Sequence, residues 1–544
     1  MAGATRMASL VPRARRLFST FTPRHVCALW SGLTVCWLPW MVLLWPANLL
    51  SDTVAQIMWW RTRHDLAAWD PSSAQALPGY AMSDQHPWLD TLIYGVVDEL
   101  GVRLGAEAWT LWAFAVLQTA LCALAFAIML VHLGALMRVP WQACVAMAVF
   151  VAVNPLFPRL MMTLVKDSTS MPFFLLLMTM TMEYIRRAHA RERLGWALPL
   201  GIVAATVMCD LTRKIALEIL AGTFLVLAIV LTGRRLASLL LAIVPVVLMT
   251  GISTVAMPAL HVAPGGKQEM LAIPLQQSAL LLVRHGGDLP DADRTALEAA
   301  FQCDVGQMAG YLHQKPGDEL MIDRGDIIKD ACFNRNATNA QLRAFLVTWA
   351  RQMPAHLGDY IDAVPWLRDP FVMGDWYNED WAVRAGWETK GTVQTILPEY
   401  KVADDGTSPI SAPQRIGRAI YMAATSLPPT ALFMRENTYA VWVPMAALAL
   451  CGVRRRYRDW TYLTPWLLTI GSLALLPGHQ SRYTWTLAYG AIMIAAIPLI
   501  GGRGAECKPV TEGIAVSSSD ANGSTVLLSH PDGHPVPAHL PESQ

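Results

Sequence analysis

Charged residues are scarce in this chain. Only 15% of its 544 residues are Asp, Glu, Lys or Arg, whereas 54% are hydrophobic. Soluble globular domains carry about 25% charged residues, so the composition excludes an ordinary soluble protein. The sequence also lacks a P-loop, a GxGxxG turn, an HExxH motif and a CxxC pair, and thus the common signatures of nucleotide, dinucleotide and zinc sites. Its 21 tryptophans favour a membrane protein, because tryptophan collects at membrane interfaces.

Long apolar runs predict an all-α, multi-pass membrane protein. A helix needs about twenty apolar residues to cross the hydrocarbon core, and ten runs reach or approach this length. They are 26–49, 108–133, 141–163, 171–185, 195–212, 215–232, 236–259, 438–453, 461–476 and 484–501. The first run is long and lacks a small-residue cleavage site, so we expect an uncleaved anchor and not a signal peptide.

Arginines between these runs predict the orientation. The basic N-terminus, 1–25, and alternate loops place sixteen arginines on one face, and the short loops of the other face hold few basic residues. By the positive-inside rule both termini are then cytoplasmic. Most other polar residues fall on the opposite face, which disfavours a kinase or a nucleotide-sugar enzyme.

The chain divides by composition into four further parts. We predict a membrane domain at 26–259 with its first outer loop at 50–107, a mainly helical extracytoplasmic module at 260–437, membrane helices at 438–501 and a disordered cytoplasmic tail at 502–544. Cys303 and Cys332 are the cysteines of the module. An oxidising compartment would allow them to form a disulfide, although compartment alone leaves open whether they pair.

The first outer loop contains the main catalytic candidates. Asp52 follows the first apolar run and could act as a general base toward an acceptor hydroxyl, or could simply cap an interfacial helix. A second amphipathic helix is expected from residue 88 onward. Between the two helices, Asp84 and His86 precede a proline, where they could orient a phosphate or a sugar, or only shape a turn.

Cations and one acid at the outer ends of later runs are candidates for binding a lipid phosphate. They are Lys166, Asp167, Arg213, Lys214 and Arg482. Each has a structural alternative. Lys166 and Asp167 could be a helix start with a snorkelling lysine, and the later cations could pair internally, Arg213 and Lys214 with Asp210 or Glu218.

Taken together, these features resemble the GT-C superfamily of integral-membrane glycosyltransferases. The likeness rests on Asp52 after the first span, on a first outer loop with two interfacial helices, and on a late soluble module. Within the superfamily the chain is similar to an uncharacterised bacterial multi-span family. The matching stretches are SDTVAQI, MSDQHPWLDTLIYG, TLVKDSTSMPFFLLL, FLVTWARQMPAHLGDYIDA and SRYTWTLAYG.

The resemblance implies a bacterial plasma-membrane enzyme that moves a sugar from a polyprenyl-phosphate donor to an extracytoplasmic glycan, lipid or protein. Asp52 would be the base, and Lys166, Arg213 and Arg482 would hold the phosphate. Better-known members carry an acidic pair in the second outer loop, where this chain has Asp167 alone, so use of a divalent metal stays open and no metal ligand is assigned. A lipid-linked-glycan flippase or a non-catalytic envelope assembly protein are the alternatives, and no nucleic-acid partner is expected.

Overall fold

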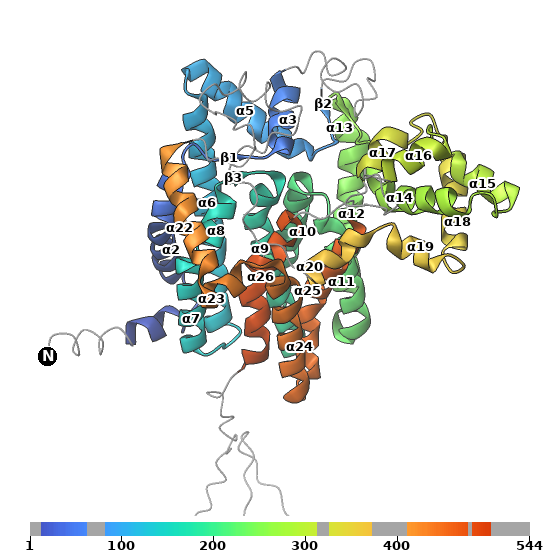
Figure 1. Cartoon of the computed structure of the whole chain (residues 1–544). Coiled ribbons are helices and arrows are strands. Elements are labelled where there is room, and N and C mark those ends of the chain that lie inside the picture. The colour runs from blue at the N-terminus through green and yellow to red at the C-terminus, as the bar shows by residue number, and fades with distance from the viewer. Residues whose placement is uncertain (1–11, 62–81, 313–325, 373–410, 477–480, 502–544) are drawn as a thin grey trace, which may run out of the picture. The chain divides into compact units, whose positions relative to one another are not determined.

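The computed structural model describes residues 12–61, 82–312, 326–372, 411–476 and 481–501, and these are almost entirely helical (Figure 1). The first helices are α2 (Pro23–Leu43), α3 (Ser51–Arg61), α5 (Trp88–Leu104), α6 (Glu107–Ala135), α7 (Trp141–Val153) and α8 (Leu156–Met161). Next come α9 (Lys166–Ala190), α10 (Ala197–Thr212), α11 (Ala216–Val230), α12 (Arg235–Gly251), a π-helical turn (Ile252–Ala256) and α13 (Met257–Ala259).

A group of short helices follows α13. It comprises α14 (Gln268–His285), α15 (Asp291–Glu298), α16 (Val305–Leu312), α17 (Asp326–Cys332), α18 (Asn339–Gln352), α19 (Leu357–Asp362), a 3-10 turn (Pro365–Arg368) and α20 (Asp369–Val372). The last helices are α22 (Ala412–Ser426), α23 (Pro428–Ala431), α24 (Val443–Val453) after a π turn (Thr438–Trp442), α25 (Trp460–Ser472) and α26 (Trp485–Ala496) after a 3-10 turn (Ser481–Thr484).

Local sequence explains where several helices begin and end. The Thr22 side chain accepts a hydrogen bond from the His25 amide at the start of α2, and Pro23 occupies its first turn. Thr338 and Gln341 form a reciprocal capping box at the start of α18. At the end of α5, Gly105 adopts the left-handed conformation, with φ of 61°, that favours glycine.

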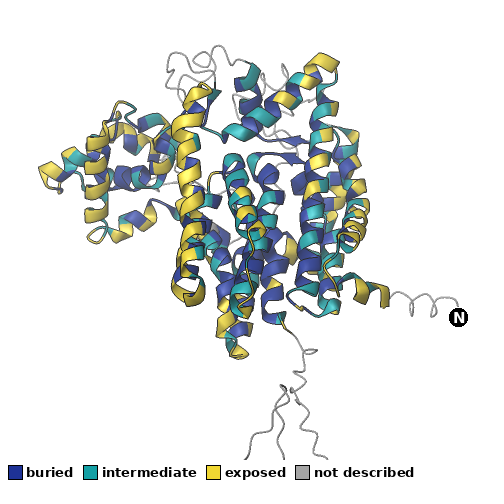
Figure 2. Cartoon of the chain, turned by 180° about the vertical axis from the view of Figure 1, so that it is seen from behind, coloured by how far each residue is buried: buried dark blue, intermediate teal, exposed yellow. Residues whose placement is uncertain are grey.

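Three helical stretches are long and apolar enough to cross a membrane: Pro23–Leu43, Glu107–Ala135 and Thr232–Ala259. They coincide with three of the ten predicted spans. Shorter apolar helices occupy part of four more predicted spans. They are Trp141–Val153, Ala197–Thr212, Ala216–Val230 and Thr438–Val453. The predicted span 141–163 does not form one helix, because α7 ends before Asn154 and the short α8 follows. Exposed residues line the outer faces of the bundle, whereas buried residues gather where helices meet (Figure 2).

Two hydrophobic cores organise the described residues. The larger core draws on α2, α3, α5 to α12, α22 and α24 to α26. The smaller core, between Leu271 and Trp366, belongs to helices α14 to α19, which we call the module. Tyr421 and Met434 pack in the larger core, and α22 lies against α2. Residues 411–437, at the end of the predicted 260–437 module, thus pack with the membrane-type helices.

Two pairs of very short parallel strands bring helix N-termini together. β1 (Asn48–Leu49) pairs with β3 (Thr163–Leu164), and α3 and α9 begin immediately after them. β2 (Met82–Ser83) pairs with β4 (Val262–Ala263), and α5 and α14 follow. Because parallel partners run in one direction, the helices that follow each pair start side by side. Positions far apart in the chain thus become neighbours.

Helix α5 presents its polar side to the protein. Asp90 and Asp98 are buried, whereas Val96, Leu100 and Leu104 are each more than half exposed. A helix in a soluble protein shows the reverse pattern. An apolar outer face suits a helix that lies at a membrane interface, as the sequence predicted for this loop.

Candidate functional site

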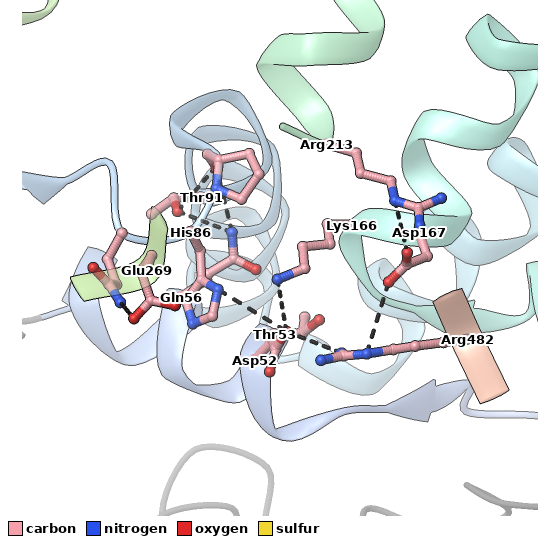
Figure 3. Close-up of polar contacts among 12 residues, drawn as sticks. Asp52, Thr53, Gln56, His86, Thr91, Lys166, Asp167, Arg213, Glu269 and Arg482 are labelled. Carbon is pink, nitrogen blue, oxygen red and sulfur yellow. Dashed lines mark hydrogen bonds and ion pairs between the residues drawn. The ribbon is translucent and has the colours of Figure 1, made fainter. Parts of the chain in front are cut away.

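Asp52 lies at the centre of a cluster of charged side chains beside the first strand pair (Figure 3). Its Oδ2 atom is 3.1 Å from Lys166 Nζ and accepts a hydrogen bond of 2.9 Å from Arg482 Nη1. The Nδ1 atom of His86 is 4.0 Å from the same oxygen. These partners come from the first turn of α9, from the turn before α26 and from the loop before α5. The structure thus assembles four candidates that the sequence left separate.

Charge, more than helix capping, governs the Asp52 carboxylate. Burial by itself would raise its pKa, but Arg482, Lys166 and His86 outweigh this and hold the pKa well below the usual value. The group is therefore ionised at neutral pH. Its described contacts are with cations and with His86, and none is with a backbone amide of α3. The capping alternative has no support among these contacts.

Asp167 forms a second, deeper ion pair. Its side chain is fully buried, and its Oδ1 atom lies 3.0 Å from Arg213 Nε. Arg482 Nε is 3.9 Å from Oδ2 of the same carboxylate, so Arg482 connects Asp52 with Asp167. Arg213 is thus paired with Asp167, and not with Asp210 or Glu218 as the alternative proposed. The contacts with Arg482 explain why Asp52 and Asp167 belong to one electrostatic unit.

Asp84 and Lys214 pair at the rim of the cluster. Lys214 Nζ lies 2.6 Å from Asp84 Oδ2 and also donates to the Asp84 carbonyl oxygen. Asp84 Oδ1 accepts a hydrogen bond from the Trp88 amide, at the start of α5. Burial raises the pKa of Asp84 despite these interactions. The carboxylate therefore orders the turn between β2 and α5 and anchors Lys214.

His86 lies inside the cluster as a neutral ring. Burial lowers its pKa to about 4, against the opposing attraction of Asp52, so the imidazole is uncharged at pH 7. The ring packs against Trp59 with 5.2 Å between centroids. Its Nδ1 atom is buried and has no hydrogen-bond partner within the described part of the chain. A neutral imidazole beside Asp52 can receive or relay a proton, or donate a hydrogen bond to a bound oxygen.

Two residues at this site were not selected from the sequence. Glu269, in the first turn of α14, accepts a 2.7 Å hydrogen bond from Gln85 and pairs with Lys329 at 2.5 Å, so it ties the first loop to the module. Asp90 is fully buried, and neither carboxylate oxygen has a hydrogen-bond partner among the residues that the structure describes. Burial, more than the nearby Lys166 and Asp167 charges, raises its pKa well above normal. In the sequence, Asp90 falls on the polar side of the amphipathic helix expected from residue 88 onward, and it was not selected as a site residue.

A small pocket adjoins the Arg213 end of the cluster. Its wall is mostly apolar and is formed by α9, α10, α11, α25 and α26. Among the lining residues are Phe174, Ile219, Leu473, Leu476 and Tyr483, together with Arg213. The pocket therefore combines an apolar wall with a cation that is itself part of the charged cluster.

The cluster favours an anionic ligand. Lys166, Arg213, Lys214 and Arg482 face three paired carboxylates, those of Asp52, Asp84 and Asp167, which leaves an excess of one positive charge. Helices α3, α5, α9 and α14 begin around it, and helix N-termini favour negative charge. A phosphate or pyrophosphate fits this balance better than a cation does.

Cys303 and Cys332 form a disulfide within the module. The bond joins the segment between α15 and α16 to the end of α17, so it crosslinks the smaller core. The sequence had left this pairing open. The predicted tail at 502–544 lies outside the described residues, as does the first-loop segment 62–81.

The comparisons with known proteins give one family match. No curated protein and no solved structure matches the chain. The model of a family of unknown function, DUF6020, matches residues 77–375, more than half of the chain. The matched range includes His86, Lys166 and Arg213 and excludes Asp52 and Arg482. The chain therefore belongs to the family of unknown function DUF6020.

Proposed function

We propose that this protein is a membrane glycosyltransferase that moves a sugar from a polyprenyl-phosphate-linked donor to an extracytoplasmic glycan, lipid or protein acceptor. The observation that carries the proposal is the environment of Asp52. One ionised carboxylate contacts two cations and faces a neutral imidazole, at a place where four helices begin. Such a site can bind a phosphate and still retain a base for a hydroxyl.

In this mechanism the donor phosphate competes with Asp52 for its cations. Lys166 and Arg482 lower the pKa of Asp52 in the free protein, which makes its carboxylate a weak base. A phosphate that takes over these cations would raise that pKa toward the range of an effective base. Asp52 then accepts the proton of the acceptor hydroxyl while the hydroxyl oxygen forms a bond to C1 of the sugar. The bond from C1 to the phosphate oxygen breaks, and the polyprenyl phosphate leaves as an anion.

The pocket beside Arg213 supplies the second part of the argument. A polyprenyl chain needs an apolar surface that is continuous with a cationic site for its phosphate. Arg213 belongs both to the apolar pocket and to the ion-pair network that reaches Asp52 through Asp167 and Arg482. This arrangement supports a lipid donor over a soluble sugar phosphate.

The proposal includes the finer description of the fold. We infer that the chain crosses a bacterial plasma membrane about ten times in a GT-C-like arrangement, with both termini in the cytoplasm. The alternating arginine loops support this orientation. The outward apolar face of α5 and the start of α3 beside the site support interfacial helices in the first outer loop.

The test is sugar transfer from radiolabelled polyprenyl-phosphate sugars in membranes that contain the wild type or Asp52→Asn. We expect the variant to lose about 100-fold or more of the transfer rate, the usual contribution of a general base. Asp98→Asn is the matched control, because Asp98 is a buried carboxylate of the same loop that pairs with Arg61 outside the cluster. Full activity in Asp52→Asn would remove Asp52 from the mechanism.

A transporter of lipid-linked glycans is the second candidate. The buried Asp167–Arg213 pair beside an apolar pocket favours it, since charges between membrane helices are typical of transport pathways. Assays on the same membranes discriminate between a glycosyltransferase and a transporter. Movement of labelled donor across the bilayer, with no transfer of sugar and no effect of Asp52→Asn, would favour transport.

A further inference from the structure

A second cluster of ligand-type side chains lies in the module, at the opposite end of α14. It consists of His285, His356 and Asp359, and one ligand atom from each lies within 4.8 Å of the other two. His285 is the last residue of α14, whereas His356 and Asp359 lie at and just inside the start of α19. This cluster contains none of the residues around Asp52.

Both imidazoles approach the same carboxylate oxygen. His285 Nε2 lies 3.1 Å from Asp359 Oδ2, and His356 Nδ1 lies 3.7 Å from it. The two rings are 4.9 Å apart between centroids. If both rings carried a proton on each nitrogen, two positive charges would meet at this distance. A single divalent ion in place of those protons would satisfy both nitrogens and the oxygen at once.

The other carboxylate oxygen is already occupied. Arg284 Nη1 donates to Asp359 Oδ1 at 2.6 Å and to Asp362 at 2.8 Å. Asp362 therefore offsets the arginine charge, and the bond to Oδ1 fixes the direction of the Asp359 carboxylate. Hydrogen bonds of this kind commonly orient metal-binding side chains.

The C-terminal end of α14, where His285 lies, also favours a cation. The C-terminus of a helix carries partial negative charge, and His285 ends the 18-residue helix α14. Zinc is bound by nitrogen at about 2.0–2.1 Å in tetrahedral sites, which places neighbouring ligand atoms roughly 3.3 Å apart. The two distances to Asp359 Oδ2 lie on either side of this spacing. Small side-chain rotations are enough to close the site.

The scaffold behind the cluster is fixed by hydrogen bonds. Gln277 of α14 donates to the Tyr360 carbonyl at 2.9 Å and accepts from Trp349 Nε1 at 2.9 Å. The Tyr360 hydroxyl in turn donates to the Trp349 carbonyl at 2.6 Å. These bonds hold α14, α18 and α19 together and keep the ligand-bearing backbones in place without a metal.

We propose that His285, His356 and Asp359 bind a divalent transition-metal ion of the zinc class. Three protein ligands leave the fourth position to water or to another ligand, and each side chain is partly accessible to solvent. The ion would join α14 to α19 and so stabilise the module. Sites of two histidines and one carboxylate also suit other late first-row metals, so zinc is the expected but not the required ion.

The test is zinc binding by the full chain, purified in detergent with an affinity tag that contains no histidine. After treatment with EDTA and dialysis against ZnCl2, we expect one zinc per chain. His285→Ala/His356→Ala should lose it. His356→Asn, which keeps the Arg284–Asp359 pair, should weaken binding by about 100-fold or more, since even the loss of an outer hydrogen bond costs about 10- to 100-fold. Cobalt bound at this site should give visible absorption that zinc displaces.

The tail supplies the decisive control. His530, His534 and His539 could bind zinc by themselves. His530→Ala/His534→Ala/His539→Ala should keep one zinc per chain if the module holds the metal. Loss of zinc in this tail variant, with retention in the double variant, would overturn the proposal, as would a wild type that binds none. Thermal unfolding without zinc checks that each variant is folded. If the double variant is not folded, His356→Asn replaces it in the zinc-binding test.

Discussion

Helix α14 has a cluster of ionisable side chains at each end, and the two clusters differ in the sign of charge that they favour. At its start, Glu269 connects through Gln85 to the loop of His86 and the Asp52 cluster, where cations are in excess. At its end, His285 meets Asp359 and His356. The helix spans about 27 Å, so the clusters are separate. Its macrodipole favours an anion at the first and a cation at the second.

The clusters also differ in burial, and this difference decides how much stability each loses when one of its charges is removed. Arg482 and Asp52 are 10% and 15% exposed, so neither charge can be left alone without a large cost. His285 and His356 are 37% and 22% exposed, and water can replace a lost partner there. We therefore expect charge removal to destabilise the Asp52 cluster strongly and the module cluster weakly.

The largest effect is expected for Arg482→Gln. Arg482 contacts both Asp52 and Asp167, so its loss leaves two carboxylates undercompensated. Removal of one member of a buried ion pair costs about 3–5 kcal/mol, which unfolding in detergent would measure. Arg103→Gln is the control, because its pair with Glu99 is exposed and should contribute less than about 1 kcal/mol. Arg482→Gln/Asp52→Asn should regain part of the loss. A double variant whose loss equals the sum of the two single losses would contradict this coupling.

A pH-dependent effect is expected from His86. Its pKa of about 4 in the folded protein lies below the usual 6.5, so the unfolded chain takes up the proton first. The stability due to the neutral ring is complete above pH 6.5 and is lost as the pH falls toward 4, by up to about 3 kcal/mol. Because 21% of the side chain is exposed, the observed loss should be smaller.

Thermal unfolding of the wild type and His86→Asn between pH 7.5 and 4 measures this contribution. The wild type should lose more stability on acidification than the variant does. Asp84 acts in the opposite direction, since its raised pKa lets the folded protein bind a proton more readily, but it is present in both proteins. Parallel curves for the two proteins would show that His86 is protonated equally easily in the folded and unfolded chain.

An intermediate effect on stability is expected when each cluster binds its own ligand. Farnesyl phosphate, a short polyprenyl phosphate, and zinc should each raise the unfolding temperature, with about 2.7 kcal/mol of stabilisation at 100 times the dissociation constant. Arg482→Gln should lose the response to farnesyl phosphate and keep that to zinc. His285→Ala/His356→Ala should show the reverse. If one variant lost both responses, the two clusters would not be independent sites.

The smallest effect is expected for Asp90→Asn. Burial raises the pKa of Asp90 well above normal, which favours the protonated carboxylic acid, and the amide replaces that acid with similar shape. Stability should change by less than about 1 kcal/mol, measured by unfolding in detergent, and sugar transfer should persist. A large loss of either would show that Asp90 is ionised and acts on the neighbouring Lys166.

Some parts of the candidate site could be predicted from residue type and position alone. Asp52 was chosen because a carboxylate just outside a span can act as a general base, and Lys166 and Arg482 because cations at the outer ends of apolar runs can bind a lipid phosphate. Their mutual contacts could not be predicted, because Asp52 and Arg482 are 430 positions apart. Arg213 shows most clearly that partners cannot be predicted from proximity in the sequence. Its nearest acids in sequence are Asp210 and Glu218, yet it pairs with Asp167.

Long-range packing sets the same limit on the fold. The sequence placed Asp90 on the polar side of an amphipathic helix, and only the structure shows that this side of α5 faces the protein interior. Residues 411–437 include a stretch that is too short and too broken to span a membrane. Their partners, which include α2, are distant in sequence and place them in the larger core.

The sequence by itself determined the class of protein. Hydropathy and helix signals act locally and add up along the chain, so they predicted an all-α protein with helices apolar enough to cross a membrane, and they singled out the candidate charged residues. Only the tertiary structure decided which charges meet. Two short parallel strand pairs align the starts of α3 with α9 and of α5 with α14, and Coulomb interactions between buried groups depend on distances that no local pattern contains.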